Sequence, residues 1–292
     1  MKIEKVINNN IISTFDHDGT ELIVMGRGLG FGKKTGQEAD EGRVEKVFRM
    51  DSEKEMEDFK NLVTRLPIEY LRLTDQIISY TKDIVGLDLN QNIYLTLTDH
   101  ISFAVDRFLK GMNFPNTLFE EIRMFYPKEF LVGKKSLELI EKYIHVKLPE
   151  DEAASIALHL VNAEYHGTVG NALQMTTMIK EIVDFIDDEY RFHPILTGTE
   201  NLEDLSESSI HKNWMISNIK YLVHRLLKLE AKDINVDQFT GFIEQNCDRE
   251  YQLVCRINRF LNEKYGCNMT KEEIFYFSII IYRAKKIAGY GD

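Results

Sequence analysis

The sequence predicts a multidomain α+β protein, in which a small antiparallel β-sheet module is followed by two tandem all-α helical bundles. Three observations support this fold class. Residues up to about Met50 alternate apolar and polar side chains with a period of two, which is typical of strands. From Ser52 onward the apolar residues recur with a period of about 3.6, which is typical of helices. The helical part also contains the same segment twice, which indicates one structural unit used in tandem.

Four short strands are expected in the N-terminal module. They lie near Lys2 to Ile7, Asn10 to Phe15, Glu21 to Met25 and Arg43 to Arg49. Residues 16–19, DHDG, are predicted to form a hairpin turn, because Gly19 can adopt a positive φ. A module of about fifty residues buries a low fraction of its surface, so we expect it to dimerise.

The next element is a helix that begins near Ser52. Asp51 and Ser52 can cap it, and its first turn is rich in acidic residues, which favour a helix N-terminus. The remaining helices divide near residues 167–171, GTVGN, because this stretch separates two strongly periodic segments. The predicted modules therefore span residues 1–55, 64–169 and 170–285.

The repeat is visible in two pairs of helical segments. Residues 148–163, LPEDEAASIALHLVNA, align with residues 269–284, MTKEEIFYFSIIIYRA. Residues 99–110, DHISFAVDRFLK, align with residues 217–228, SNIKYLVHRLLK. Three aligned positions matter for function, and the pairs are His100 with Asn218, His159 with Ile280, and Arg107 with Arg225. The arginine occurs in both copies, whereas the two histidines occur in one copy only.

Length and composition narrow the class of protein. A chain of 292 residues is long enough for two or three domains. Its net charge of −11 argues against a protein that coats nucleic acid or anionic membrane along its whole surface, and leaves a local basic site open. The three cysteines lack CxxC spacing, so neither a disulfide framework nor a zinc site is expected. The sequence shows no signal core and no apolar stretch of membrane length, which predicts a cytoplasmic protein.

A glycine-rich segment, MGRGLGFGKKTG at residues 25–36, could bind a ligand. Its spacing matches neither the GxGxxG fingerprint nor a P-loop, so nucleotide binding is not expected. Closely spaced glycines let a backbone approach a ligand, Arg27, Lys33 and Lys34 supply charge, and Phe31 can stack on a base. These are the ingredients of RNA recognition. The alternative is a flexible hairpin loop with Phe31 packed inside.

Four motifs in this order, KIEKVINNNII, ELIVMGRGLGFGKK, LTDHISFAVDR and IALHLVNAE, resemble the BglG/LicT/SacY family of transcriptional antiterminators over nearly the whole chain. The resemblance implies an N-terminal co-antiterminator (CAT) domain that dimerises through a four-stranded sheet. This domain would bind a hairpin in nascent mRNA and prevent the overlapping terminator from forming. Two helical regulatory domains, called PRDs, would follow, with histidines that the sugar phosphotransferase system phosphorylates.

The motifs also assign RNA contacts by resemblance, and these are Lys5, Asn10, Gly26, Arg27, Gly30 and Phe31. Lys5 and Arg27 would contact phosphates, and the amide of Asn10 would contact base edges. The glycines would allow close approach, and Phe31 would stack. Asn8 belongs to the same run, and the alternative for residues 8–10 is a polar turn between two strands.

Each of His100 and His159 lies in an apolar helical segment. Considered alone, such a histidine is more often a hydrogen-bonded core residue. The resemblance instead identifies both as phosphoacceptors for a sugar-specific enzyme II, with Asp99 holding or modulating the ring of His100. Phosphorylation adds up to about two negative charges, which would repel at a dimer interface and abolish RNA binding. Sugar transport would drain the phosphate and restore readthrough.

The second helical copy departs from the family pattern, in which its own two histidines are phosphorylated by the carrier HPr. Asn218 and Ile280 cannot accept phosphate in this way, so we predict that stimulation through these two positions is absent. The second domain would then serve for dimerisation and relay. The other histidines of this half, none at a repeated position, are His193, His211 and His224.

Three other functions remain as alternatives. A metal-dependent helical hydrolase could use His159 and His166, but no HExxH motif is present and no acid lies at the required spacing. A PRD-containing regulator of DNA would need a helix-turn-helix, and the N-terminus is predicted to form strands. A pure phosphocarrier would leave the glycine-rich loop unexplained. We therefore expect a regulator without enzymatic activity, metal, cofactor, DNA partner or stable membrane insertion.

Overall fold

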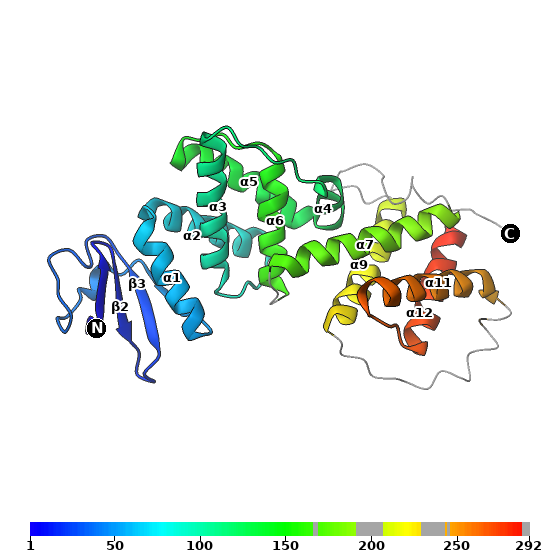
Figure 1. Ribbon diagram of the computed structural model, residues 1–292, viewed down its shortest axis with the longest axis horizontal. Coiled ribbons are helices and arrows are strands. Elements are labelled where there is room, and N and C mark those ends of the chain that lie inside the picture. The colour runs from blue at the N-terminus through cyan, green and yellow to red at the C-terminus, as the bar shows by residue number, and fades with distance from the viewer. Residues whose placement is uncertain (166–168, 191–206, 229–242, 244–245, 288–292) are drawn as a thin grey trace. The chain divides into compact units, whose positions relative to one another are not determined.

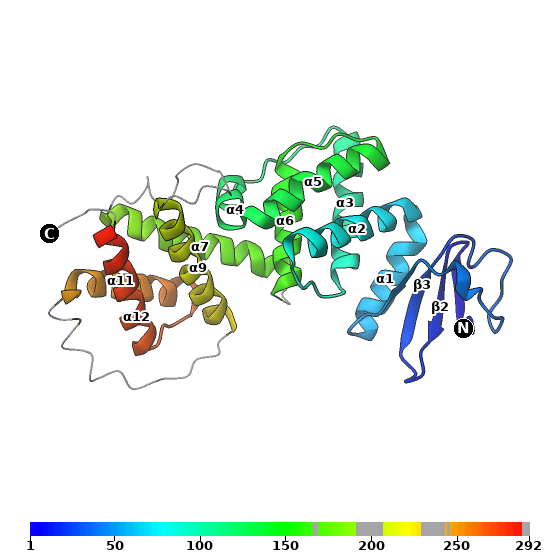
Figure 2. The same cartoon turned by 180° about the vertical axis from the view of Figure 1, so that it is seen from behind.

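The computed structural model describes residues 1–165, 169–190, 207–228, 243 and 246–287. The chain divides into two compact units, Met1–Ala172 and Leu173–Asp292. The first unit contains the sheet and six α-helices, and the second unit is helical where it is described (Figures 1 and 2). The predicted fold class, a small antiparallel sheet followed by helices, is confirmed. Within the described ranges, no helix has the length and apolar character needed to cross a membrane.

The sheet has four antiparallel strands in sequence order, and these are β1 (Lys5–Asn8), β2 (Ile11–Phe15), β3 (Glu21–Met25) and β4 (Lys46–Phe48). The turn between β2 and β3 forms as predicted, and Gly19 in it has a φ of 79°. Two predicted strands are too long. The first strand begins at Lys5, and Lys2 makes only an isolated bridge to Glu38. The fourth begins at Lys46, because the 3-10 helix η1 (Glu41–Arg43) precedes it.

Both faces of the sheet are covered. On one face, Ile11, Ile23 and Phe48 belong to a core that continues into the helices of the first unit. On the other face, Ile12 and Val24 pack with three residues from outside the strands, namely Ile3, Leu29 and Ala39. Adjacent residues of β2 and of β3 therefore serve opposite cores, as the alternation of side chains along a strand requires.

The helices of the first unit are α1 (Glu53–Arg65), α2 (Ile68–Tyr80), α3 (Ile93–Leu109), α4 (Phe119–Phe125), α5 (Pro127–Ile144) and α6 (Asp151–Glu164), and a short π-helix, η2 (Thr81–Val85), follows α2. The predicted cap of α1 is confirmed, because the hydroxyl of Ser52 accepts the backbone N–H of Glu55 at 3.2 Å. α1 lies beside the sheet in both ribbon views. The ring of Phe48 in β4 lies 5.1 Å from that of Phe59 in α1 and 4.9 Å from that of Tyr94 in α3.

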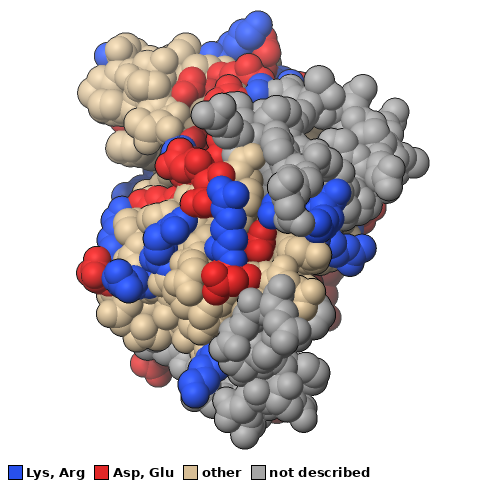
Figure 3. All heavy atoms as spheres, turned by 90° about the vertical axis from the view of Figure 1, so that its right-hand side faces the viewer, with Lys and Arg blue, Asp and Glu red and all other residues tan. Residues whose placement is uncertain are grey.

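The helices of the second unit are α7 (Val169–Tyr190), α9 (Glu207–Lys228), α11 (Asp248–Tyr265) and α12 (Lys271–Ile287), of which α7 begins in the first unit. Figure 3 shows lysine and arginine interspersed with aspartate and glutamate on one face of the molecule. The second unit also contains ion pairs between helices. Glu189, for example, pairs with Arg249 at 2.8 Å and with Arg256 at 2.6 Å.

Candidate RNA-binding loop and histidine pair

The side chain of Asn10 organises the glycine-rich loop. Its Oδ1 accepts the backbone N–H of Gly28 at 2.9 Å. Its backbone carbonyl accepts the N–H of Gly26 at 2.9 Å, and the neighbouring carbonyl of Asn9 accepts the N–H of Gly30 at 3.0 Å. The turn between β1 and β2 thus holds the loop through three hydrogen bonds. Because Oδ1 is used within the protein, the Nδ2 group is the part of the Asn10 amide that is left for a ligand.

Gly26 and Gly30 are both buried against other parts of the backbone. A Cβ atom on Gly26 would lie 2.0 Å from the carbonyl oxygen of Arg43, and one on Gly30 would lie 2.3 Å from that of Asn8. A larger residue fits at neither position without moving the backbone. The close approach that these glycines permit is therefore between segments of the protein itself.

The side chains with chemistry suited to RNA lie on the outside of this frame. Phe31 is 70% exposed, so the alternative in which its ring packs inside is wrong. Arg27 and Lys5 are exposed as well. Among the described residues, no ion pair engages the guanidinium of Arg27, whereas its backbone N–H donates to Glu45 at 3.2 Å. The loop thus presents an aromatic ring and a free cation on a fixed backbone.

Asn8 belongs to the turn and also connects it to the helices. Its Oδ1 accepts the backbone N–H of Asn10 at 2.9 Å, so this residue forms the polar turn that was the alternative to RNA contact. Its Nδ2 donates to the carbonyl oxygen of Val63 in α1 at 3.0 Å. Asn8 therefore links the turn that holds the glycine-rich loop to the first helix.

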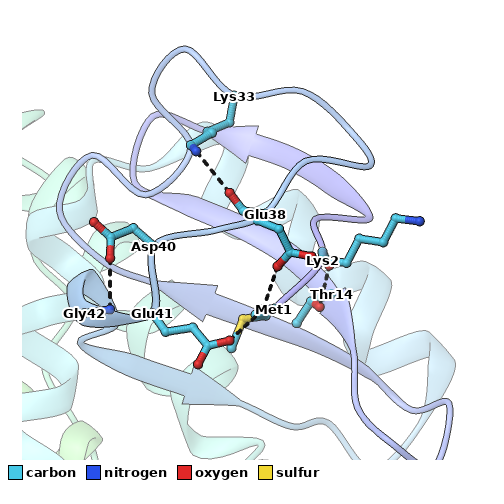
Figure 4. Close-up of polar contacts among 8 residues, drawn as sticks. All are labelled: Met1, Lys2, Thr14, Lys33, Glu38, Asp40, Glu41 and Gly42. Carbon is cyan, nitrogen blue, oxygen red and sulfur yellow. Dashed lines mark hydrogen bonds and ion pairs between the residues drawn. The ribbon is translucent and has the colours of Figure 1, made fainter.

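The segment after the loop is tied back to the start of the chain (Figure 4). The ammonium group of Met1 lies 3.0 Å from Glu38 and 2.6 Å from Glu41, and these contacts, with Glu41 first, raise its pKa. Lys33 donates to the carbonyl oxygen of Glu38 at 3.0 Å. Because Lys33 is engaged here, Arg27 is the better placed of the two for a ligand.

His100 on α3 and His159 on α6 lie against each other, with ring centroids 4.6 Å apart and planes inclined by 41°. The side chain of His100 is 16% exposed, and His159 is 8% exposed. Burial, with a smaller contribution from His100, lowers the pKa of His159 to about 3. His159 is therefore neutral near neutral pH, and His100 is the outer member of the pair.

A buried carboxylate that was absent from the sequence-based site completes this cluster. One oxygen of Glu152 accepts a hydrogen bond from Arg107, and the other lies 3.2 Å from Nε2 of His100. The guanidinium of Arg107 lies 5.6 Å from the ring centroid of Phe103 and 5.3 Å from that of Phe114. The repeat contained the signal for this pair, because Arg107 aligns with Arg225 and Glu152 aligns with Glu273.

Asp99 does not hold the ring of His100. Its carboxylate accepts a hydrogen bond from Arg65 of α1 at 2.6 Å, so the acidic partner of His100 is Glu152. Neighbours in sequence on a helix point in different directions, which explains why adjacency to His100 was misleading. Asp99 instead connects the histidine-bearing helix to the helix that contacts the sheet.

The second copy keeps the charged pair and replaces the histidines. Arg225 and Glu273 form an ion pair, as their counterparts do. Asn218 accepts a hydrogen bond from the hydroxyl of Tyr276 at 3.2 Å, and Ile280 is 2% exposed. His224 is half-buried, the side chain of His211 is not among the described atoms, and His193 lies outside the described residues.

In the described residues, no cluster of potential metal ligands supports the alternative of a metal-dependent hydrolase. No group of three or more histidine, cysteine, aspartate or glutamate residues gathers there in a way that could hold a metal ion. His166, one of the two histidines that this alternative needs, lies outside the described residues.

Comparison with protein families identifies both kinds of module. The family "CAT RNA binding domain" matches residues 1–57, and the family "PRD domain" matches residues 75–163 and 199–284. The two PRD matches contain the two copies of the repeat, and the first of them includes His100 and His159.

Individual proteins are similar along nearly the whole chain. "Transcription antiterminator LicT" of Bacillus subtilis (strain 168) is 37% identical over 288 residues, covering 99% of this chain and 100% of that protein. "Beta-glucoside operon antiterminator" of Dickeya chrysanthemi is 31% identical, covering 98% and 97%. Among solved structures, "Crystal structure of GlcT CAT-PRDI" matches with a TM-score of 0.50 and 32% identity, covering 56% of this chain and 97% of that one.

Proposed function

Since the chain belongs to the family of transcription antiterminators in which a CAT RNA-binding domain precedes PRD domains, we propose that it binds a hairpin in an mRNA leader as a dimer. Binding would prevent the overlapping terminator from forming, so that transcription continues. The proposed modules are the CAT domain at residues 1–55 and the two PRD domains at residues 64–169 and 170–285.

The observation that carries the proposal is the exposed ring of Phe31 on a fixed loop. Exposure of an apolar ring of this size to water costs free energy, and stacking on a base would remove the ring from water. Arg27 lies on the same loop with its guanidinium directed to no ion pair in the described part of the chain. Lys5 on β1 supplies a second exposed cation. Such local charge lets an acidic chain bind phosphates at one place.

The six proposed RNA-site residues divide by role. We assign Lys5 and Arg27 to phosphates, Phe31 to base stacking, and the Nδ2 group of Asn10 to a base edge. Gly26 and Gly30 act indirectly, because they allow the backbone contacts that shape the loop. Mutation of Gly26 or Gly30 should therefore lower both the stability of the protein and its affinity for RNA. Mutation of a residue that contacts RNA should lower mainly the affinity.

Regulation is proposed to act through His100 and His159, with a sugar-specific enzyme II of the phosphotransferase system as the phosphodonor. A phosphoryl group adds up to about two negative charges at the histidine pair, in a unit where the carboxylate of Glu152 is already buried. The greater exposure of His100 makes it the first acceptor, because phosphoryl transfer needs access to a ring nitrogen. Phosphorylation would then disfavour the active dimer and release the RNA.

The second PRD domain is proposed to lack this control at the repeated positions. Asn218 and Ile280 have no ring nitrogen to phosphorylate, so HPr would not stimulate the protein through them. The retained Arg225 and Glu273 pair keeps the structural frame of the site. We assign this domain to dimerisation and to relay of the state of the first PRD domain.

The test is binding of the full chain to hairpin RNAs from leaders upstream of sugar-transport genes. The full chain is needed because Phe48 of the sheet packs against helices of the first bundle. Phe31→Ala is expected to weaken binding about five- to hundredfold, the range for loss of one stacked base. Arg27→Ala should weaken binding and reduce its salt dependence.

The matched control is Phe15→Ala, because Phe15 is also an exposed ring of the sheet, at 52%, but lies at the opposite end of the β2–β3 pair from Met25, where the glycine-rich loop begins. Binding should survive this change. If no hairpin binds to the folded dimer, or if all three variants bind as well as the parent, RNA recognition through this loop is refuted.

A further inference from the structure

We infer that Glu152 is a positioning residue for His100, and that Pro149 leaves its carboxylate available for this role. The inference rests on the proposed phosphorylation of His100 and concerns how this chain prepares the imidazole for it. Glu152 is 2% exposed, and its Oε2 lies 3.2 Å from Nε2 of His100. Its Oε1 accepts a hydrogen bond from Arg107. Each oxygen of this buried carboxylate thus faces a different nitrogen.

The second copy of the repeat shows what the same acid does without a histidine. Glu273 aligns with Glu152 and also pairs with an arginine. Its Oε2 accepts the backbone N–H of Thr270 at 2.8 Å, and the hydroxyl of Thr270 accepts the N–H of Glu273 at 3.2 Å. This reciprocal pair is a capping box at the start of α12. In the second copy, therefore, the helix N-terminus and Arg225 both bond the same oxygen, Oε2, of the carboxylate.

Pro149 aligns with Thr270, so the start of α6 cannot bond the carboxylate of Glu152 in this way. Proline has neither a backbone N–H nor a hydroxyl, so it can form neither bond of a capping box. Accordingly, α6 begins at Asp151 with no side-chain hydrogen bond at its cap. The oxygen that the helix does not use faces His100 instead.

Arg107 keeps the carboxylate in place. The arginine side chain is 14% exposed, and its guanidinium contacts the rings of Phe103 and Phe114 as well as Oε1 of Glu152. Cation–π contacts of this kind restrain a guanidinium that is partly removed from water. Because Oε1 of Glu152 pairs with Arg107, Oε2 is the oxygen that remains, and it lies beside Nε2 of His100.

The position of Glu152 selects the reactive nitrogen of His100. A carboxylate beside Nε2 favours the tautomer that carries its hydrogen on Nε2 and leaves a lone pair on Nδ1. The N–H direction is not yet aligned with the oxygen in this structure, as is common before a substrate binds. His159, on the neighbouring helix, is neutral and brings no competing positive charge to the ring.

Phosphoryl transfer then proceeds as follows. Nδ1 of His100 attacks the phosphorus of the donor, a P–N bond forms, and the bond between phosphorus and the donor atom breaks with its electron pair remaining on the donor. The ring keeps the Nε2 hydrogen and becomes positively charged. Glu152 stabilises this charge and holds the ring orientation, as the buried acid of a catalytic triad does for its histidine.

A purely structural role for the Glu152 and Arg107 pair is the competing explanation, since the second copy keeps the pair without histidines. Two variants separate the explanations. Glu152→Gln removes the charge at similar size. Pro149→Thr restores the capping box, which stabilises α6 and draws the carboxylate away from His100. A structural role predicts that Pro149→Thr is harmless, whereas a positioning role predicts that it slows phosphorylation.

The experiment uses the full chain with potassium phosphoramidate as the phosphodonor, so that no protein partner is needed. Mass spectrometry follows the modification of His100, and nitrogen NMR of labelled histidine shows which ring nitrogen carries the hydrogen. Both variants should slow modification of His100 about tenfold or more, by analogy with the loss of a residue that orients a metal-binding histidine. They should also reduce the fraction of the tautomer with hydrogen on Nε2. Thr270→Pro in the second copy is the matched control and should change neither.

The inference is overturned if the variants keep their folded spectrum while the rate and the tautomer of His100 remain those of the parent. It is also overturned if the phosphoryl group is found on Nε2 of His100. If Glu152→Gln does not fold, the rate and the tautomer of His100 in Pro149→Thr alone test the inference. Failure of the proposed function looks different, because RNA binding of the unmodified chain, measured beside these reactions, would then be absent.

Discussion

Arg72 of α2 donates two hydrogen bonds to Glu45, at 2.9 and 3.1 Å. Glu45 in turn accepts the backbone N–H of Arg27 in the glycine-rich loop at 3.2 Å. A single carboxylate therefore joins the first helical bundle to the loop proposed to bind RNA. Both charged side chains are more than one-third exposed, so solvent screening limits the strength of this connection.

The first prediction concerns this connection. Arg72→Ala should weaken RNA binding without abolishing it, because an exposed ion pair contributes about 0.2–1 kcal/mol, which is no more than about fivefold in affinity. The measurement is titration of the full chain with hairpin RNA. Arg49→Ala is the control, since it removes an arginine of the sheet module that carries the same charge and pairs at 3.5 Å with Asp16. Equal effects of both variants would mean that only net charge matters.

The second prediction separates two reasons for glycine in the loop. Gly30→Ala places a Cβ 2.3 Å from the carbonyl of Asn8, and the resulting backbone shift should cost about 1–3 kcal/mol in free energy of unfolding. Gly32→Ala has open space around its Cβ but a φ of +68°, and should cost about 1–2 kcal/mol from conformation alone.

Denaturant unfolding gives the stabilities of both glycine variants, and RNA titration gives their affinities. We expect Gly30→Ala to lose RNA binding more completely than Gly32→Ala, because only its clash displaces the turn that holds the loop. Unchanged binding by Gly30→Ala would show that the frame tolerates this shift.

The third prediction is a pH dependence. An unfolded histidine protonates near pH 6.5, whereas the pKa of folded His159 is about 3. Between these values the unfolded state binds more protons, so the free energy of unfolding decreases as the pH falls from 6.5. The contribution is fully present above that pH, and its slope approaches about 1.4 kcal/mol per pH unit for one proton.

Denaturant unfolding at several pH values between about 7.5 and 5 tests this dependence. His159→Gln should flatten the curve, and His17→Gln, which changes an exposed histidine of the sheet module, should leave it as steep as in the parent. A parent-like slope in His159→Gln would locate the pH dependence elsewhere in the chain.

The fourth prediction is a gain of function in the second PRD domain. The Arg225 and Glu273 pair is already present, so Asn218→His with Ile280→His should make this domain a substrate of HPr. Radiolabelled phosphate transfer from HPr and an antitermination reporter are the measurements. Asn213→His, which adds a histidine to an exposed position of α9 outside the repeat, is the control. Phosphorylation of the parent by HPr in this domain would contradict the proposed loss of control.

Periodicity predicted the order and type of the elements but not the contacts that define the site. The glycine-rich loop was recognised from composition, yet its glycines meet carbonyls of Asn8 and Arg43, which only the folded chain brings near. Asn10 was identified as a candidate, but its use of Oδ1 to hold the loop depends on an antiparallel pairing between strands. Local sequence carries little information about such long-range partners.

The histidine cluster illustrates the same limit. The repeat singled out His100 and His159 because they differ between copies, and they do lie together. Glu152 was overlooked because it does not differ between copies. A residue that is retained in both copies but has a different neighbour in each can be recognised only when the packing of α3 against α6 is known.

Burial of the Phe48 ring opposes separation of the sheet from the helices of the first unit. The ring is fully buried between Phe59 and Tyr94, which belong to the helices, although it is part of the sheet. Lifting the sheet from these helices would expose it, at a cost of about 1.5–3 kcal/mol for one large apolar side chain. Any event that separates the sheet from these helices must therefore supply at least this free energy.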